Sequence, residues 1–423
     1  MKNYLESRQK AAAAQWNLKN EIVLIGSGDY IHIPGRADQT YPFRAHSEYI
    51  YLTDRERPAA VLAFDPQEGW ADFVPRVTQD EKVWIGSSVA DEGVDFSGFA
   101  AWMEKRKGRR VAVLGCPVAG IQSDAALEAE VREGLMQVRR PKDEIEMERM
   151  RKAAEATRAG YSAIQPLLKP GMTERQIQIE LEAAFFRNGG DRTAYDSIVG
   201  GGPNSAIFHF SPSHRAFAAG EMVLIDAGAE CGCYASDVTR TYAASGRFTP
   251  EQADIYKIVL ATEEAAVKKC TPGTEYKSIH LGASRDIAQG LLDLGILKGN
   301  LDSLLEQDAQ ALFFPHGVGH MVGLGVRDAG GYLPGRQRTD SPGLRFLRID
   351  LILKPGFTVT IEPGVYFVPA LLQDQELRRQ HKDNVNWDRV DKMMNFGGIR
   401  IEDNIHVTDK GYEVLTANIP KHI

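Results

Sequence analysis

Three short apolar runs rich in β-branched residues lie in the first third of the chain, and turn residues end each of them. The runs are EIVLIGSG at 21–28, AAVLAFD at 59–65 and RVAVLGC at 110–116, and their length and composition predict β-strands. Between the last two, residues 93–108 have apolar positions at helical spacing and a basic end, as helix C-termini prefer, so a helix is predicted there. This alternation predicts an α/β domain.

From residue 139 onwards the apolar positions follow the period of a helix. Residues 139–160 begin with acidic side chains and with Pro141, which we place in the first turn of a long helix. A second helix is predicted over 173–190, with a capping threonine at its start and a glycine pair at its end, and a third over 251–269. We therefore place a domain boundary at residue 140.

Composition narrows the class of protein. Of the 423 residues, 43% are hydrophobic and 25% are charged, as in soluble globular proteins. Fifty basic and 57 acidic residues give a net charge of −7 with no basic block, so we expect no nucleic-acid partner and no membrane partner. No apolar run reaches the roughly 18 residues of a membrane span. The four cysteines are too scattered for a disulfide framework, and the opening residues MKNYLESRQK lack a secretory signal, so we expect a cytoplasmic protein.

Two aspartates lie in apolar segments, where a charged side chain is unexpected. Residues 222–228 form an apolar run with Asp226 near its end, and residues 234–242, which contain Asp237, are predicted to be its partner strand. A hairpin of the two strands would bring the aspartates close together. Burying an acid is unfavourable unless it is paired or binds a metal ion. Taken alone, each aspartate is better explained by a salt bridge or a turn cap.

Two later segments alternate apolar and polar residues with the period of a β-strand. In residues 358–366 the alternation places Glu362 on the same face as two threonines, and in residues 398–404 it places Glu402 on the same face as Arg400. One such glutamate alone would be explained as a side chain facing solvent. Two strands that each direct a glutamate to one face indicate a shared polar site.

His316 and His320 stand four residues apart in HGVGH, and the glycines between them indicate a backbone close to a ligand, although two polar loop residues would also explain them. The candidate metal ligands are Asp226, Asp237, His320, Glu362 and Glu402. Four clustered carboxylates would repel one another, and two divalent cations would remove that repulsion. Oxygen ligands with one nitrogen favour Mn²⁺, with Co²⁺ or Zn²⁺ as alternatives. Neither HExxH nor GxSxG occurs, so neither a one-zinc protease nor the nucleophile elbow of a serine hydrolase competes with this interpretation.

The ordered set LIDAG, SDVTRTY, HGVGH, TIEPGVY and GIRIED resembles the pita-bread metallopeptidases (M24), which include methionine aminopeptidase, aminopeptidase P and prolidase. This resemblance covers the chain from about residue 139 to its end. Residues 41–54 are similar to the opening motif of the creatinase-type amino domain in the Xaa-Pro branch of that family. The resemblance implies an α/β creatinase-type domain at 1–140 and an α+β pita-bread catalytic domain at 141–423.

The resemblance also implies what the residues do. The protein would be a dinuclear metallopeptidase that hydrolyses the bond preceding proline, with the five candidate ligands holding the metal ions and Asp237 and Glu402 bridging them. Glu362 would move a proton, while His209 and His316 would orient the substrate and stabilise the tetrahedral intermediate. The substrate-binding positions of the family are occupied here by Tyr195, His209, Arg327, Arg348 and Arg400.

Two features favour the prolidase type. Arg348, in SPGLRFLR, matches the arginine that binds the C-terminal carboxylate of the substrate, and a long insert at 369–395 separates the two glutamate strands. An Xaa-Pro dipeptidase is therefore the first hypothesis. Aminopeptidase P, acting on longer Xaa-Pro peptides, is the alternative, and a non-catalytic peptide-binding protein is the third. The expected partners are proline-containing dipeptides or short peptides and, in a homodimer, a second copy of the chain.

At one position the sequence departs from the family. Arg327 occupies the place of a histidine that helps to hold the substrate, seven residues after His320. The exchange is either tolerated at the edge of the pocket or supplies a second fixed positive charge for a peptide carboxylate. In a further interpretation the side chain turns away and pairs with Asp328.

Overall fold

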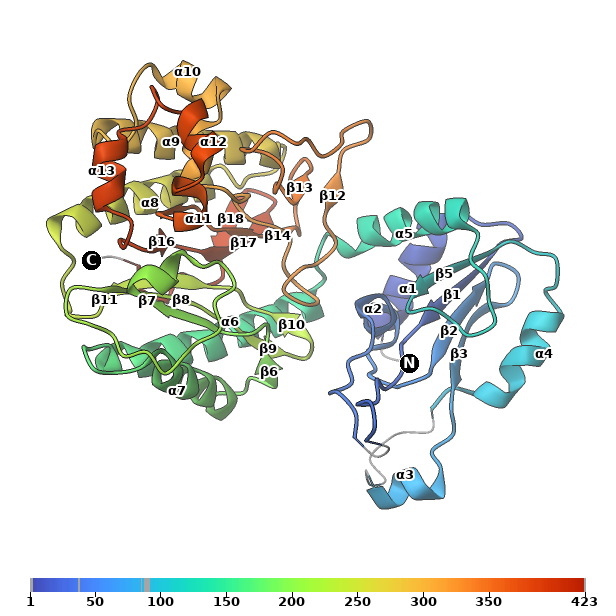
Figure 1. Ribbon diagram of the computed structural model, residues 1–423. Helices are drawn as coiled ribbons and strands as arrows, with labels where there is room; N and C mark the ends of the chain where they lie inside the picture. The colour runs from blue at the N-terminus through green and yellow to red at the C-terminus, as the bar shows by residue number, and fades with distance from the viewer. Residues whose placement is uncertain (1–2, 37–38, 85, 87–91, 422–423) are drawn as a thin grey trace. The chain divides into compact units, whose positions relative to one another are not determined.

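The computed structural model describes residues 3–36, 39–84, 86 and 92–421 (Figure 1). The chain forms two compact units, Met1–Arg139 and Arg140–Ile423, which we describe separately as the amino-terminal unit and the carboxy-terminal unit. None of the described helices is both long enough and apolar enough to cross a membrane.

A five-stranded mixed sheet forms the centre of the amino-terminal unit. Its strands, in the order β4-β3-β2-β1-β5, are β1 Ile22–Gly26, β2 Val61–Asp65, β3 Gly69–Val74, β4 Val94–Asp95 and β5 Val111–Gly115. β1 is fully buried and pairs antiparallel with β2 and parallel with β5. The strands predicted at 21–28, 59–65 and 110–116 are confirmed as β1, β2 and β5.

The helices of this unit are α1 Asn3–Trp16, α2 Ser47–Thr53, α3 Gln79–Trp84, the 3₁₀ turn η1 Phe96–Gly98, α4 Phe99–Glu104 and α5 Ala125–Arg139. The helix predicted over 93–108 is wrong in its first part, because Val94 and Asp95 form β4 beside β3. The Asp95 side chain accepts a hydrogen bond from the Ser97 N–H at 2.9 Å and caps the turn that follows. The helix therefore starts later than the apolar spacing suggests.

Capping boxes start the first helices of the carboxy-terminal unit. In α6 Glu144–Ile164, Asp143 accepts from the Glu146 N–H and the Glu146 side chain accepts from the Asp143 N–H. This box puts the helix start beyond Pro141, so the expectation that Pro141 lies in the first turn is wrong. The other two predicted helices are confirmed as α7 Glu174–Arg187, which Thr173 caps, and α8 Pro250–Lys268.

Most strands of this unit lie between helices α6 and α7 on one side and α8 and α9 (Tyr276–Asp293) on the other (Figure 1). Its remaining helices are α10 Leu301–Glu306, α11 Pro369–Leu372, α12 Gln375–Gln380 and α13 Trp387–Lys392, with 3₁₀ turns η2 Gln165–Leu167, η3 Gly202–Ala206 and η4 Ala309–Leu312. The insert noted at 369–395 thus forms three short helices.

The strands of the carboxy-terminal unit are short and fall into small sheets. In sheet order they are β11 Thr239–Ala243, β8 Met222–Asp226 and β7 Ile198–Gly201; β14 Thr358–Ile361, β17 Asp403–Thr408 and β18 Gly411–Val414; β15 Gly364–Tyr366 and β16 Gly398–Arg400; β10 Tyr234–Ala235, β9 Ala229–Cys231 and β6 Arg192–Thr193; and β12 Gly331–Tyr332 and β13 Ile349–Asp350.

The hairpin expected to join the two aspartate segments is more complex than predicted. β8 and β11 pair antiparallel, but β9 and β10 form a hairpin of their own between them. Gly232 and Cys233 both have positive φ, 55° and 71°, which suits the tight turn of this inner hairpin. Asp237 consequently lies in the connection between β10 and β11 rather than within one long strand.

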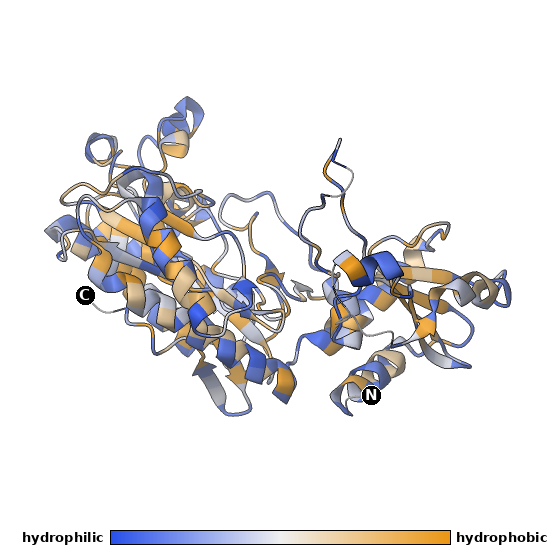
Figure 2. Cartoon of the chain, turned by 90° about the horizontal axis from the view of Figure 1, so that it is seen from below, coloured by the Kyte–Doolittle hydropathy of each residue, from blue (hydrophilic) through white to orange (hydrophobic). Residues whose placement is uncertain are grey.

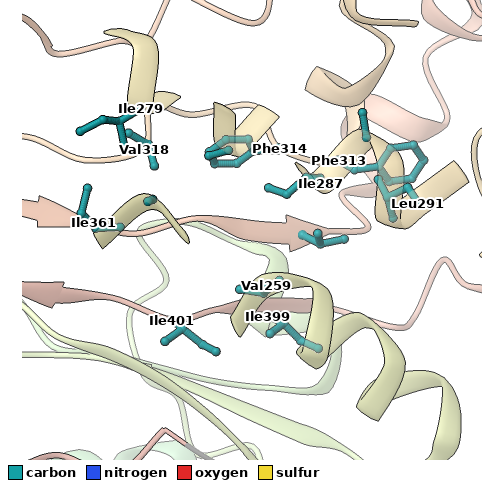
Figure 3. Close-up of a cluster of buried hydrophobic side chains, with 14 of the residues drawn as sticks. Val259, Ile279, Ile287, Leu291, Phe313, Phe314, Val318, Ile361, Ile399 and Ile401 are labelled. Atoms are coloured by element: carbon teal, nitrogen blue, oxygen red, sulfur yellow. The ribbon is translucent and has the colours of Figure 1, made fainter. Parts of the chain in front are cut away.

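The main apolar core packs α8 and α9 against the strands (Figure 3). Val259 of α8 and Ile287 of α9 are fully buried in it, as are Ile399 and Ile401. Because side chains alternate along a strand, burial of the two isoleucines directs Arg400 and Glu402 to the opposite side. Figure 2 shows the corresponding division on the helices, which carry alternating hydrophilic and hydrophobic bands.

Candidate active site

A cavity of about 610 Å³ lies in the carboxy-terminal unit, and every site residue predicted from the sequence lines it. These residues are Tyr195, His209, Asp226, Asp237, His316, His320, Arg327, Arg348, Glu362, Arg400 and Glu402. Phe208, Phe210 and Phe346 add aromatic surface to the lining. The fold thus collects into one cavity residues that are spread between positions 195 and 402 of the chain.

Asp237, His320 and Glu402 form the buried centre of the cavity. One ligand atom of each residue lies within 4.8 Å of the others. His320 Nε2 is 3.2 Å from Asp237 Oδ2 and 3.7 Å from Glu362 Oε1. His320 Nδ1 donates to the Met321 carbonyl at 2.8 Å, which leaves the lone pair of Nε2 facing the carboxylates, as in a histidine that binds a metal ion.

Strand pairing and side-chain hydrogen bonds hold the acidic residues in place. Thr239, at the start of β11, pairs with Asp226 on one side and bridges to Glu402 on the other, and its hydroxyl donates to Glu402 Oε2 at 2.7 Å. The Asn404 side chain accepts from the Asp237 N–H at 2.9 Å and donates to the Asp237 carbonyl at 2.6 Å. Sequence patterns alone do not single out Thr239 or Asn404 for these contacts.

A tyrosine and an arginine hold Asp226. The Tyr195 hydroxyl oxygen lies 2.6 Å from Asp226 Oδ1 and 2.5 Å from Asp237 Oδ1, but one hydroxyl proton can be donated to only one carboxylate at a time. The buried Arg400 guanidinium forms an ion pair with Asp226 Oδ2. The two aspartates are thus held side by side with fewer donors than their oxygens can accept from.

The acidic residues carry more negative charge than their surroundings neutralise. Burial is the main cause of the raised pKa values of Asp226, Glu362 and Glu402, and Asp237 raises the pKa of all three further. Arg400 opposes the rise at each position, but one guanidinium does not balance four carboxylates. Two divalent cations would balance the charge, and carboxylate oxygens with one imidazole nitrogen are a suitable ligand set for them.

A hydrogen-bonded chain runs from Arg400 to His316. Arg400 Nη1 donates to the Tyr366 hydroxyl at 2.8 Å, and this hydroxyl donates to His316 Nε2 at 2.8 Å. His316 Nδ1 donates to the Gly317 carbonyl at 2.8 Å. Burial and Arg400 lower the pKa of His316 to about 3, so its ring is neutral near pH 7. Tyr366 is the last residue of TIEPGVY, yet nothing in that motif indicates its part in this chain.

Two arginines and His209 line the cavity and keep contact with solvent. Burial and the nearby Arg327 lower the pKa of Arg348. Within the part of the chain that the structure describes, neither guanidinium has a carboxylate partner. The interpretation that Arg327 turns away to Asp328 is wrong, because Asp328 pairs with the buried Lys142 at 3.0 Å. The cavity therefore presents two positive side chains near its acidic centre.

Buried carboxylates around an imidazole, at the bottom of a cavity with cationic side chains, are the features of a metal-dependent hydrolase. Comparison with known proteins identifies the family. The family model described as Metallopeptidase family M24 matches residues 148–409, and the model described as Aminopeptidase P, N-terminal domain, matches residues 4–97. The chain belongs to metallopeptidase family M24, whose members use divalent metal ions. This confirms the expected α+β pita-bread domain and the creatinase-type domain before it.

Individual relatives are similar over most of the chain. The probable Xaa-Pro aminopeptidase pepP of Botryotinia fuckeliana is 32% identical over 401 residues, which cover 90% of this chain and 86% of that protein. The Xaa-Pro dipeptidase of Homo sapiens is 35% identical over 287 residues, 67% of this chain and 58% of that protein. The structure of the Pseudomonas aeruginosa aminopeptidase PepP has a TM-score of 0.81 and 30% identity, and covers 100% of this chain and 96% of that one.

Proposed function

We propose that this metallopeptidase hydrolyses the peptide bond that precedes proline. Relatives over most of its length are named Xaa-Pro aminopeptidases, and a further relative is named Xaa-Pro dipeptidase. One cavity that contains all the predicted site residues supports carrying this activity over. A bond before proline has no N–H, so recognition depends on fitting the pyrrolidine ring, for which Phe208 and Phe346 offer apolar surface.

In this proposal two divalent ions are held by Asp226, Asp237, His320, Glu362 and Glu402. Asp237 and Glu402, which lie at the buried centre together with His320, would contribute to both ions as the family resemblance implies. Mn²⁺ is the first candidate, with Co²⁺ and Zn²⁺ as alternatives. When bound, such ions polarise a carbonyl group and make a bound water acidic near neutral pH.

The side chains of the protein then have distinct tasks. Glu362 would take up a proton from the attacking water and pass it on, because its carboxylate lines the cavity. His209 is exposed and orients the substrate. Both ring nitrogens of His316 are already hydrogen-bonded, so we assign it the orientation of Tyr366 in place of the expected direct contact with the substrate and the tetrahedral intermediate. At the other end of this series of hydrogen bonds, Arg400 orients the Tyr366 hydroxyl and Asp226.

The preference for short substrates is proposed from two arginines, Arg327 and Arg348. An Xaa-Pro dipeptide has its terminal carboxylate directly on the proline residue, and guanidinium groups bind carboxylates with two parallel hydrogen bonds. Arg327 and Arg348 line the cavity, and Arg327 is close enough to lower the pKa of Arg348. We therefore propose Xaa-Pro dipeptides as the preferred substrates.

Aminopeptidase P activity on longer peptides is the second candidate. It is favoured by similarity along the whole chain, since the Xaa-Pro aminopeptidase of Haemophilus influenzae matches 100% of this chain and 96% of its own length at 30% identity. Dipeptidase and aminopeptidase activity share the same metal centre and differ in what the cavity accepts after proline. Substrate length therefore decides between them.

The test uses the full chain with added Mn²⁺ and three peptides: Ala-Pro, Ala-Pro-Ala and the proline-free Ala-Ala. Release of alanine is followed by mass spectrometry, and bound metal is measured in the same samples. Faster turnover of Ala-Pro than of Ala-Pro-Ala is expected. Faster turnover of Ala-Pro-Ala would assign aminopeptidase P activity. If the metal-loaded protein hydrolysed Ala-Ala but neither of the two proline peptides, the Xaa-Pro proposal would be rejected.

The homodimer, the cytoplasmic location and the boundary at residue 140 between the two domains remain predictions. Light scattering of the full chain tests the homodimer by measuring its molecular mass. Cell fractionation measures the second, and separate expression of residues 141–423 tests whether the catalytic domain folds alone.

A further inference from the structure

A buried histidine in α9 holds a segment that forms one wall of the cavity. His280 is 1% exposed, and its Nε2 lies 2.6 Å from the carbonyl oxygen of Gly343. A carbonyl only accepts hydrogen bonds, so Nε2 carries the proton and donates it. Gly343 belongs to residues 341–348, which we call the wall segment. His280 does not line the cavity itself; it reaches the cavity through this segment and through Phe314, whose ring packs on that of His316.

The wall segment presents Phe346 and Arg348 to the cavity. It also packs closely on the loop that carries His316, because a Cβ atom added to Gly317 would lie 2.8 Å from the Phe346 carbonyl oxygen. A displacement of the segment would therefore move the aromatic and the cationic side chain together. Substrate recognition and the position of this backbone are coupled by geometry.

The upstream half of the wall segment borders a second cavity of about 510 Å³, which Ser341 and Gly343 line. On its other side Gly343 packs closely on Asp308, because a Cβ atom added to it would lie 2.5 Å from Asp308 Oδ1. The Ser341 hydroxyl donates to Asp308 Oδ2 at 2.6 Å, and the His280 bond holds the next turn. Downstream, Leu347 anchors the segment in the main core.

We propose that His280 is a positioning residue for substrate recognition, because it fixes the Gly343 carbonyl and thereby the place of Phe346 and Arg348. This positioning role rests on the proposed function in one respect, namely that Arg348 binds the carboxylate of the substrate. The ring centroid of His280 is 5.7 Å from that of Phe314, so a phenylalanine in its place keeps an aromatic ring beside Phe314 and lacks the donor.

The test compares His280→Phe, which lacks a donor, with His280→Gln, which retains an N–H group. Since small misplacements of recognition groups are costly, we expect His280→Phe to raise KM for Ala-Pro about tenfold with kcat changed less than about twofold, and His280→Gln to recover most of the loss. Tyr256→Phe is the matched control, because it removes a buried hydroxyl that donates to the Lys421 carbonyl at 2.8 Å, away from the wall segment.

Hydrogen exchange of the amides of residues 341–348 reads out the segment itself. Exchange there should become faster in His280→Phe and stay unchanged in Tyr256→Phe. If His280→Phe does not fold, Ser341→Ala removes the second upstream anchor and should show the same faster exchange and a higher KM. Unchanged exchange and unchanged KM in the folded variants would overturn the proposal.

A double-mutant comparison separates this inference from the proposed function. Where His280 acts through Arg348, adding His280→Phe to Arg348→Ala should raise KM less than about twofold further. Fully additive effects would show that His280 does not act through Arg348. Unchanged KM in Arg348→Ala alone would instead reject the carboxylate assignment, and the exchange measurement would still decide whether His280 holds the wall segment.

Discussion

Replacement of Arg327 by histidine tests whether this side chain sets substrate length. Arg327 lines the cavity, and its charge lowers the pKa of Arg348, so a carboxylate placed near both would be attracted by both. Arg327→His removes the permanent charge, because an imidazole is largely neutral above pH 7. The change also restores the residue that the family resemblance implies at this position.

The exposure of Arg327 limits the expected loss. A hydrogen bond to a charged group contributes about 1.5–3 kcal/mol, whereas an ion pair in contact with solvent contributes about 0.2–1 kcal/mol. Arg327 faces a cavity but keeps contact with solvent. We therefore expect its contribution to binding the carboxylate to lie between these two ranges, at about 1 kcal/mol. This corresponds to roughly a fivefold lower kcat/KM for Ala-Pro. Ala-Pro-Ala carries its carboxylate one residue further and should change less than about twofold.

The assay measures kcat/KM for both peptides at about pH 8, where histidine is neutral, together with bound metal. Arg247→His is the matched control, since Arg247 is exposed and carries the same charge but does not line the cavity. The expected result is a selective loss for Ala-Pro in Arg327→His and none in the control. Equal losses for the two peptides, or no change for either, would refute the reasoning that Arg327 sets substrate length.

Further predictions concern the metal centre. Asp237→Ala, His320→Ala and Glu402→Ala should each abolish activity and lower bound metal, because each removes a residue of the buried centre; full metal content in all three by elemental analysis would contradict the assignment. Tyr366→Phe removes the hydroxyl to which Arg400 donates and should lower kcat about tenfold with metal retained; an unchanged kcat would show that this hydroxyl is dispensable. Burial raises the pKa of Glu402, so the metal-free fold favours its protonated form and should lose stability as pH rises from about 5 to 8. Metal binding needs the ionised form, so stabilisation by metal should grow over that range; thermal unfolding with and without chelator tests both, and a pH-independent difference would refute this reasoning.

Elements that depend on local signals could be predicted from the sequence, and elements that depend on distant pairing could not. α7 begins at Thr173 because its side chain and that of Gln176 cap each other, a pattern visible within four residues. β4 exists because it pairs with β3, and no local pattern shows this. α1 also lacks a local signal, because its buried face includes two polar residues, Arg8 and Gln9. Their side chains donate hydrogen bonds to backbone carbonyls of α2.

The candidate ligands could be found because a charged residue in an apolar run is rare, as with Asp226 at the end of the fully buried β8. The contacts that orient them could not, because they join distant segments. Tyr366 meets His316 only when β15 folds against the histidine loop. The orientation of Arg327 could not be predicted either, because its sequence neighbour Asp328 pairs with Lys142, which lies far earlier in the chain.

The same strand residues build the core and the metal centre, which explains how mutually repelling carboxylates are held together. Ile399 and Ile401 are fully buried in the core, and Arg400 and Glu402 alternate with them on the cavity side. Moving Glu402 away from Asp237 would pull the isoleucines out of the core, which costs about 1.5–3 kcal/mol for each buried side chain. Apolar packing therefore keeps the ligand atoms of the centre within 4.8 Å of one another against their repulsion. A divalent ion would find these ligands already in place, so we expect metal affinity to depend on the packing behind the strand as well as on the ligands in front of it.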